Sequence, residues 1–274
     1  MPIRSSVTIS LVPEARGGPF VFWDDLPAAC AKANQLGFDA IEIFPPSPGA
    51  IEVRGVRKLL DDHGLALAAM GTGAGWLREK LHLCLPEAAS RAKAREFIRC
   101  IIDVAGELKA PAIIGSMQGR HGEGVDRARA LGYLSDSLED LGEHAKRWNV
   151  PLLYEPLNRY ETNLVNTIEA GVSLLSGIST RNVKLLADLF HMNIEEAEID
   201  AAILAGGDKI GHVHFVDTNR RAAGMGHMDF EPIASALSAV GYEGYASAEA
   251  FSYPDPDSAA EATMVAFREF FRQS

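Results

Sequence analysis

The chain has 274 residues, of which 26 are basic and 37 acidic, and its formal net charge is −11. A charge of this sign disfavours nucleic acids and anionic membranes as partners, because both repel an acidic protein. The N-terminus lacks an apolar signal core and no apolar run reaches the length of a membrane span, so we expect a cytoplasmic protein. Cys30, Cys84 and Cys100 form no Cys-x-x-Cys pair, which argues against a disulfide framework or a thiolate zinc site.

Apolar runs of strand length alternate with longer segments of helical period along the whole chain. Strands are predicted at Val7–Leu11, Ala40–Phe44, Leu65–Met70, Ala112–Gly115, Leu152–Glu155, Val183–Asp188, Ile210–Val216 and Tyr245–Ala250. Helices are predicted at Leu26–Leu36, Val56–His63, Pro86–Leu108, Arg127–Trp148, Ile168–Leu175, Ile199–Ala205, Pro232–Val240 and Ser258–Phe271. This alternation predicts one α/β domain over residues 1–274, a (β/α)8 TIM barrel. An open sheet is disfavoured because no Gly-x-Gly-x-x-Gly follows the first strand.

The segment 150–167 is the most informative part of the sequence. Pro156 ends the fifth predicted strand directly after Glu155, which places this carboxylate at the C-terminal end of a buried strand. Burying it is costly unless a metal, a cation or several donors compensate its charge. Five more polar residues follow closely, which favours a functional loop over a simple connector: Asn158, Arg159, Glu161, Asn163 and Asn166.

Other predicted strands also end in ionisable residues, and in a TIM barrel these ends form the active face. Strand six ends in Asp188, strand seven carries His212 and His214, and strand eight reaches Glu249. We therefore expect Glu155, Asp188, His214 and Glu249 to bind one divalent ion. Three carboxylates and one imidazole suit Mn²⁺, Mg²⁺ or Co²⁺, and suit Zn²⁺ less well. His212 points the same way as His214 but lies deeper, so we expect it to act behind the ligands or in packing.

Two further residues follow these strands in loops. His191 lies three residues after Asp188 and can overhang the site, whereas Arg220, after strand seven, can reach an anionic or enediolate oxygen. Gly224 and Gly226 would permit tight turns in the same loop. The glycine-rich segment Gly71–Gly75 is interpreted as a loop that lets substrate approach the backbone.

With these residues in hand, the sequence resembles the ketose 3-epimerases, which include the D-tagatose and D-psicose 3-epimerases, of the xylose-isomerase-like barrel superfamily. The matching stretches are Glu155-Pro-Leu-Asn-Arg-Tyr-Glu161, Asp188-Leu-Phe-His191-Met-Asn, His212-Val-His214, Asn219-Arg220 and Ser247-Ala-Glu249. The resemblance is strong in the second half of the chain, whereas in the first half it extends only to the architecture.

The resemblance implies that the four predicted ligands hold a divalent metal, usually manganese. It further implies that Glu155 and Glu249 form the acid/base pair, and that Glu161, His191 and Arg220 contact substrate oxygens. We therefore expect a metal-dependent epimerase or isomerase of a ketose or keto-sugar, with a small sugar as substrate.

The implied chemistry is removal of a proton next to a carbonyl, which needs a base and a cation beside the enediolate oxygen. If a second carboxylate returns the proton on the opposite face of the substrate, the enzyme is an epimerase. If one base serves a single face, it is an aldose–ketose isomerase of the hydroxypyruvate type. A keto-sugar or keto-inositol dehydratase or lyase could use the same site. A DNA-repair nuclease is disfavoured by the net charge and by the single histidine ligand, and a catalytically dead binding module by the presence of all four ligands. A homodimer and a homotetramer are the alternatives expected for the oligomeric state.

Overall fold

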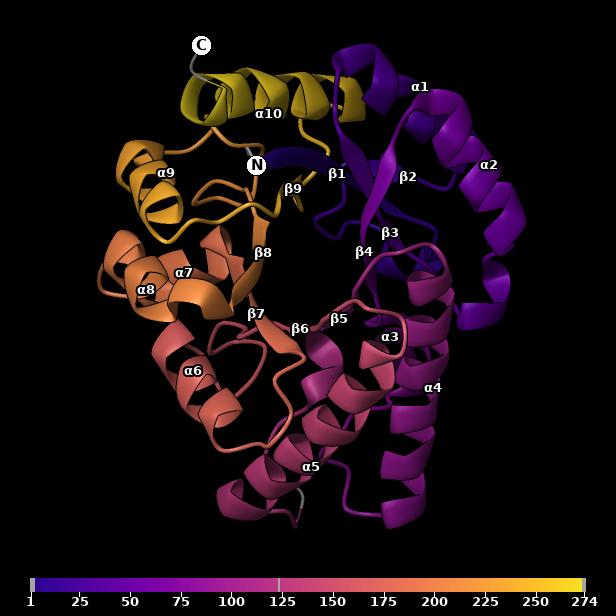
Figure 1. The fold of residues 1–274 in the computed structure, drawn as a ribbon, viewed down its shortest axis with the longest axis vertical. Coiled ribbons are helices and arrows are strands. Elements are labelled where there is room, and N and C mark those ends of the chain that lie inside the picture. Colours follow the sequence, from indigo (N-terminus) through magenta and orange to yellow (C-terminus); the bar gives the residue numbers. More distant parts are fainter. Residues whose placement is uncertain (1–2, 123, 273–274) are drawn as a thin grey trace.

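The computed structural model describes residues 3–122 and 124–272, and its strands form a closed ring surrounded by helices (Figure 1). The strands are β1 (Arg4–Ser10), β2 (Phe22–Trp23), β3 (Ala40–Phe44), β4 (Ala66–Gly71), β5 (Ala112–Ile114), β6 (Leu152–Tyr154), β7 (Val183–Asp188), β8 (Ile210–His214) and β9 (Tyr245–Ala248). Neighbours pair in the order β2-β1-β3-β4-β5-β6-β7-β8-β9, and β1 also pairs with β9. This last pairing closes a parallel barrel, so the predicted TIM barrel is confirmed. The short β2 was not predicted. It pairs with Ile9 and Ser10 at the end of β1, whereas β9 pairs with β1 only as far as Val7.

The helices form the outer layer of the barrel. They are α1 (Leu26–Leu36), α2 (Val53–His63), α3 (Ala74–Glu79), α4 (Ala88–Glu107), α5 (Arg127–Lys146), α6 (Ile168–Ser176), α7 (Leu189–Glu195), α8 (Ile199–Gly206), α9 (Phe230–Ala239) and α10 (Pro256–Phe271). Polar caps begin several of them: the carboxylates of Asp25 and Asp126 accept hydrogen bonds from the backbone N–H of Ala28 and Arg129. No helix in the described part of the chain is both long and apolar enough to span a membrane.

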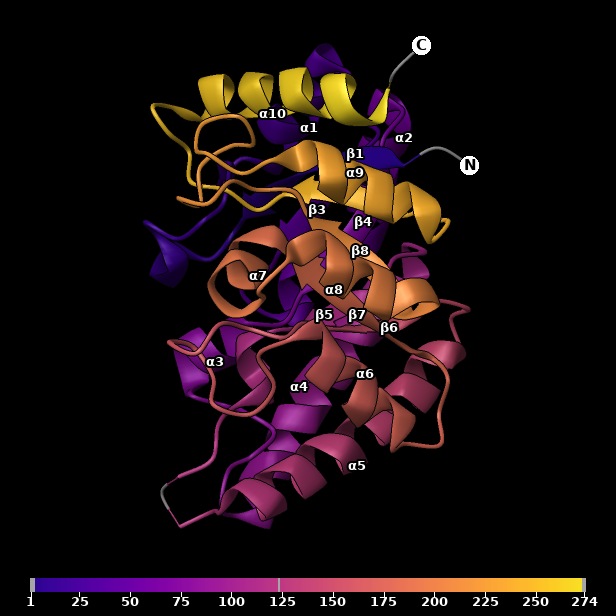
Figure 2. The same cartoon turned by 90° about the vertical axis from the view of Figure 1, so that its left-hand side faces the viewer.

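Two helices were missed by the sequence analysis. Helix α3 has six residues and α7 has seven, and neither is long enough to display a clear helical repeat. Their positions matter because both follow the C-terminal ends of strands. In Figure 2 they lie on the left, whereas the N-terminus lies on the right. The left side of that view is therefore the mouth of the barrel.

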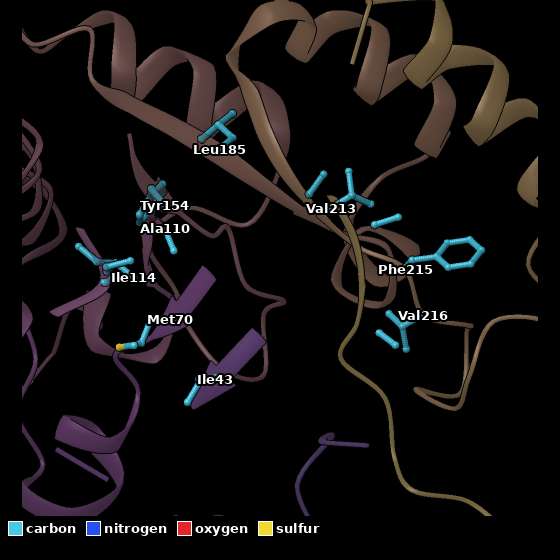
Figure 3. Packing of buried hydrophobic residues seen from close by; sticks show 14 of the residues in the cluster. Ile43, Met70, Ala110, Ile114, Tyr154, Leu185, Val213, Phe215 and Val216 are labelled. Carbon is cyan, nitrogen blue, oxygen red and sulfur yellow. The ribbon is translucent and has the colours of Figure 1, made fainter. Parts of the chain in front are cut away.

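The strands present different surfaces to their two sides. Outward-facing residues pack against the helices in one large apolar core, part of which is drawn in Figure 3; it includes Ile43, Met70, Ile114, Tyr154, Leu185 and Val213. Inside the barrel, one side is apolar and consists of Ala69, Ile113, Leu153 and Leu186. The other side carries buried polar groups, namely Ser6, Thr8, Glu42, His212 and Ser247. Buried polar groups usually need internal partners, and Thr8 donates to the Ala248 carbonyl while Glu42 contacts His212. The hydroxyl groups of Ser6 and Ser247 bond to no residue that the structure describes.

Candidate metal and active site

A cavity of ≈ 340 Å³ opens at the mouth of the barrel. The predicted site residues that line it are Glu155, Glu161, His191, His214, Arg220 and Glu249. Asp188 does not line the cavity, and only 1% of its surface is exposed. The structure thus brings six predicted residues to one cavity and places the seventh beneath them.

The four predicted metal ligands converge on one point. One donor atom from each of Glu155, Asp188, His214 and Glu249 lies within 4.8 Å of the other three. The Nδ1 atom of His214 lies 3.0 Å from Oδ2 of Asp188 and 3.5 Å from Oε1 of Glu155 and Oε2 of Glu249. Oε1 of Glu155 is buried and accepts no hydrogen bond from any residue described. Three carboxylates and one imidazole, with one carboxylate oxygen that accepts no hydrogen bond from the described residues, fit a hard divalent cation.

The barrel backbone fixes this geometry. Asp188 ends β7 and His214 ends β8, and the two residues are direct partners in the parallel ladder. The two oxygens of Asp188 have different contacts, since Oδ1 accepts from the backbone N–H of His191 and caps α7, while Oδ2 faces His214. Gly115 leaves room for the Glu155 carboxylate, because a Cβ atom there would lie 2.5 Å from its Oε2.

Burial and mutual charge shift the pKa values of the cluster in opposite directions. Burial raises the pKa of Glu155 to about 8, although His214 opposes the shift, and burial likewise raises the pKa of Glu249. Burial alone would raise the pKa of Asp188, but the Arg220 guanidinium holds it well below its ordinary value. The surrounding carboxylates raise the pKa of His214 far above its ordinary value despite its burial. Without a metal, these pKa shifts favour the protonated forms of Glu155 and His214 at neutral pH.

Glu42, which was not predicted as a site residue, is buried on β3 inside the barrel. Its Oε1 lies 3.2 Å from Nε2 of His214, and its Oε2 lies 2.8 Å from Nε2 of His212. Glu42 thus holds the ring nitrogen of His214 that faces away from the cluster, as carboxylates behind metal-binding histidines do. His212 lies behind the cluster, where the sequence analysis placed it. The available signal was a single acidic residue in the otherwise apolar run Ala40–Phe44.

Arg220 and His191 lie directly above the cluster. Arg220 Nη2 is 3.3 Å from Asp188 Oδ2 and also donates to Glu249, and Arg220 Nη1 is 3.1 Å from His191 Nε2. Burial lowers the pKa of His191 to about 3, so its ring is neutral at pH 7. Arg220 adopts a left-handed backbone conformation with φ 58°, which is uncommon for this residue type and typical of strained functional positions.

The loop that carries Arg220 is organised around the buried carboxylate of Asp217. This side chain accepts hydrogen bonds from the backbone N–H of Thr218, Gly224 and Met228. Gly224 has φ 89°, as expected for a tight turn. Gly226 has a different role from the predicted one, since a Cβ atom there would collide with Asp217.

The polar loop after β6 is mainly structural. Asn166 donates to the carbonyls of Leu157 and Thr162, Asn163 bonds the backbone of His121, and Arg159 pairs with Glu195. Only two of the five polar residues reach the site. Glu161 lines the cavity, and Asn158 lies 2.7 Å from Nδ1 of His191 and also donates to Glu161.

The interpretation of Gly71–Gly75 as a loop holds only for Thr72 and Gly73, because Gly71 ends β4 and α3 begins at Ala74. Gly71 and Gly73 do line the cavity, but their close neighbour is Phe44, which a Cβ atom would approach to 2.5 and 3.0 Å. The phenyl rings of Phe44 and Phe20 stack with centroids 4.7 Å apart. Together with Trp76 they form an aromatic wall of the cavity that the sequence analysis did not identify.

Comparison with known proteins agrees with the predicted resemblance. Residues 30–270 match the model of the Xylose isomerase-like TIM barrel family. An L-ribulose 3-epimerase of Mesorhizobium japonicum is 32% identical over 83% of this chain and 76% of its own length. A 3-dehydro-D-guloside 4-epimerase of Escherichia coli is 28% identical over 77% of this chain and 82% of its own length. The crystal structure of a D-allulose 3-epimerase from Methylomonas sp. superposes with a TM-score of 0.82 at 25% identity, covering 98% of this chain and 99% of that one. These relatives are epimerases, which are isomerases, and the chain belongs to the xylose isomerase-like TIM barrel family, within its ketose 3-epimerase group.

Proposed function

We propose that the protein is a divalent-metal-dependent epimerase of a ketose or keto-sugar, acting by proton abstraction next to the carbonyl. The observation that carries this proposal is the convergence of Glu155, Asp188, His214 and Glu249 on one point, with a buried Glu155 oxygen that accepts no hydrogen bond from the described residues. The relatives support it, because enzymes named as sugar epimerases share the family and most of the chain length.

In this proposal the four converging side chains hold the ion. Mn²⁺ is the ion we expect, and Mg²⁺, Co²⁺ or Zn²⁺ are the alternatives, because oxygen donors dominate the set. A bound divalent ion supplies Lewis-acid stabilisation of the negative oxygen that forms when the proton leaves carbon. Glu42 orients His214 from behind through its hydrogen bond.

The remaining groups act on the substrate itself. Glu155 and Glu249 exchange the proton with carbon, one as base and the other as acid. Arg220 contacts both Glu249 and Asp188, so its guanidinium is positioned to donate to an anionic substrate oxygen. His191 stays neutral and Glu161 lines the cavity, and both are assigned to hydroxyl groups of the sugar.

The direct test of this function is proton NMR in deuterated water with a panel of ketoses and 3-keto-glycosides. The expected result is metal-dependent replacement of one carbon-bound proton next to the carbonyl, together with appearance of the epimer. Chelation should abolish both signals and added Mn²⁺ should restore them. Formation of an unsaturated product with loss of water would instead identify a dehydratase, and a panel without any exchange would contradict the proposal.

Metal binding is expected to release about two protons at pH 7, because the ion must displace them from Glu155 and His214. Both groups have raised pKa values in the metal-free fold, so each is protonated there at pH 7 and each must lose its proton to become a ligand. Affinity should therefore increase as pH rises, and the Glu155 contribution should level off above about pH 8. Calorimetric titration of Mn²⁺ in buffers of different ionisation enthalpy measures the released protons.

The matched control for the proton release is Glu155→Gln, whose side chain carries no titratable proton. This variant should release about one proton fewer than the wild type in the same buffers. A release near zero in the wild type would contradict the assigned ligands, since the apparent binding enthalpy would then not depend on the buffer.

A further inference from the structure

A second cavity adjoins the mouth of the barrel. It measures ≈ 270 Å³ and shares Trp76, Ser116 and Glu161 with the cavity above the cluster. Its outer wall is formed by His82, Arg120 and Tyr160, none of which faces the first cavity. A ligand seated over the cluster can therefore continue past Trp76 into a separate space.

Aromatic rings and donors form this second space. Trp76 stands between the two cavities, and His82 packs against it edge-on with ring centroids 5.7 Å apart. His82 is held from below by Gly119, where a Cβ atom would collide with the imidazole. Tyr160 is 76% exposed, and so large an exposed ring at the rim of a cavity is available to cover a ligand.

The charges of this space suit a neutral ligand that is rich in hydroxyl groups. Arg120 is exposed and forms no ion pair with any residue the structure describes, so its guanidinium is available as a hydrogen-bond donor. The carboxylate of Glu161 lies on the same wall and is about half exposed, with 48% of its side chain accessible. One cation beside one anion does not form the paired cationic grip that a phosphate requires.

We propose that the substrate has two parts, a keto-sugar ring over the cluster and a second sugar ring between Trp76 and Tyr160. This inference rests on the proposed function and narrows its substrate class to keto-sugars that carry a glycosidic substituent. The hydrophobic C–H face of the second ring packs on the two aromatic side chains, while Arg120 and Glu161 bond its hydroxyl groups.

The test compares substrates that differ only in their substituent. Deuterium exchange is followed for the 3-keto forms of glucose, methyl glucoside, maltose and cellobiose. With the wild type, KM for the better disaccharide should be about tenfold lower than for the methyl glucoside, the gain expected from one stacked ring. Tyr160→Ala should remove this preference and leave exchange of the methyl glucoside unchanged, whereas Tyr160→Phe should retain it. Arg120→Ala should weaken it partly.

Tyr253→Ala is the matched control, because this half-exposed tyrosine lines a different cavity, to which Trp76 and Glu161 do not contribute. If Tyr253→Ala lost the preference for the disaccharide and Tyr160→Ala kept it, the assignment of the second sugar ring to Tyr160 would be overturned. Equal KM for all four sugars, or a lower KM for a keto-sugar phosphate than for the disaccharides, would also overturn it.

A second measurement separates the two proposals. Saturation-transfer NMR with unoxidised maltose and cellobiose should show contact of the second ring with the wild type and none with Tyr160→Ala. Contact without any deuterium exchange would retain the second subsite and contradict the epimerase. Deuterium exchange without such contact would support the proposed epimerase function and contradict the proposed second subsite.

Discussion

Asp188→Asn is expected to weaken Mn²⁺ binding by at least about 10²-fold. Loss of a residue that only hydrogen-bonds a metal ligand costs ~10–100-fold in affinity, and loss of a proposed ligand should cost more. Asp188 is the most buried carboxylate of the cluster and lies 3.0 Å from His214. Its amide analogue can still cap α7 through its oxygen, so the fold should persist while the negative charge is lost. Metal content after dialysis and calorimetric titration measure the effect.

The control for this variant is Glu42→Gln, which removes a charge behind His214 without removing a proposed ligand. Its metal affinity should fall less than that of Asp188→Asn. If an Asp188→Ala, His214→Ala double variant still bound one metal ion per chain, the ion would be held elsewhere and the proposed ligand set would be wrong.

Glu155→Gln and Glu249→Gln are each expected to reduce epimerisation by about 10³-fold or more, because each removes one of the two groups that exchange protons with carbon in the proposed mechanism. Glu249→Gln should lower metal affinity less than Asp188→Asn does, since Glu249 is the most exposed of the four proposed ligands, with 16% of its side chain accessible. One of the two variants should still exchange the substrate proton with solvent, because removal of a proton from one face needs only the carboxylate that remains.

Deuterium incorporation by each variant distinguishes the possible mechanisms. Exchange without epimerisation in one variant supports two bases with separate tasks. Full epimerisation in both variants would exclude the two-base mechanism, and β-elimination by the wild type would favour the dehydratase.

Much of the barrel could be predicted because local sequence determines it. Apolar runs mark the strands, and Gly37 and Gly64 end α1 and α2 in left-handed conformations. The proposed ligands were visible for a similar reason, since an ionisable residue at the end of an apolar strand is conspicuous by itself.

The remaining features depend on contacts between distant segments. Glu42 meets His214 across 172 positions of sequence, and the register of β3 with β4 shifts between Ile41 and Glu42, which no local pattern reveals. The aromatic wall combines Phe20, Phe44 and Trp76 from three separate segments. The left-handed conformation of Arg220 likewise follows from the loop around Asp217 rather than from its own residue type.

The cluster and the cavity wall come from different parts of the architecture. The four converging side chains stand at or directly after the ends of β6 to β9, where the hydrogen-bond ladder of the barrel sets their spacing. Part of the surrounding wall instead comes from α3, which carries Trp76, and from connecting segments that carry residues such as Phe20 and Glu161. Insertions and replacements in those segments can therefore accumulate without moving the reacting groups. This division makes the chain a scaffold in which substrate preference can diverge over evolutionary time while the chemistry is inherited intact.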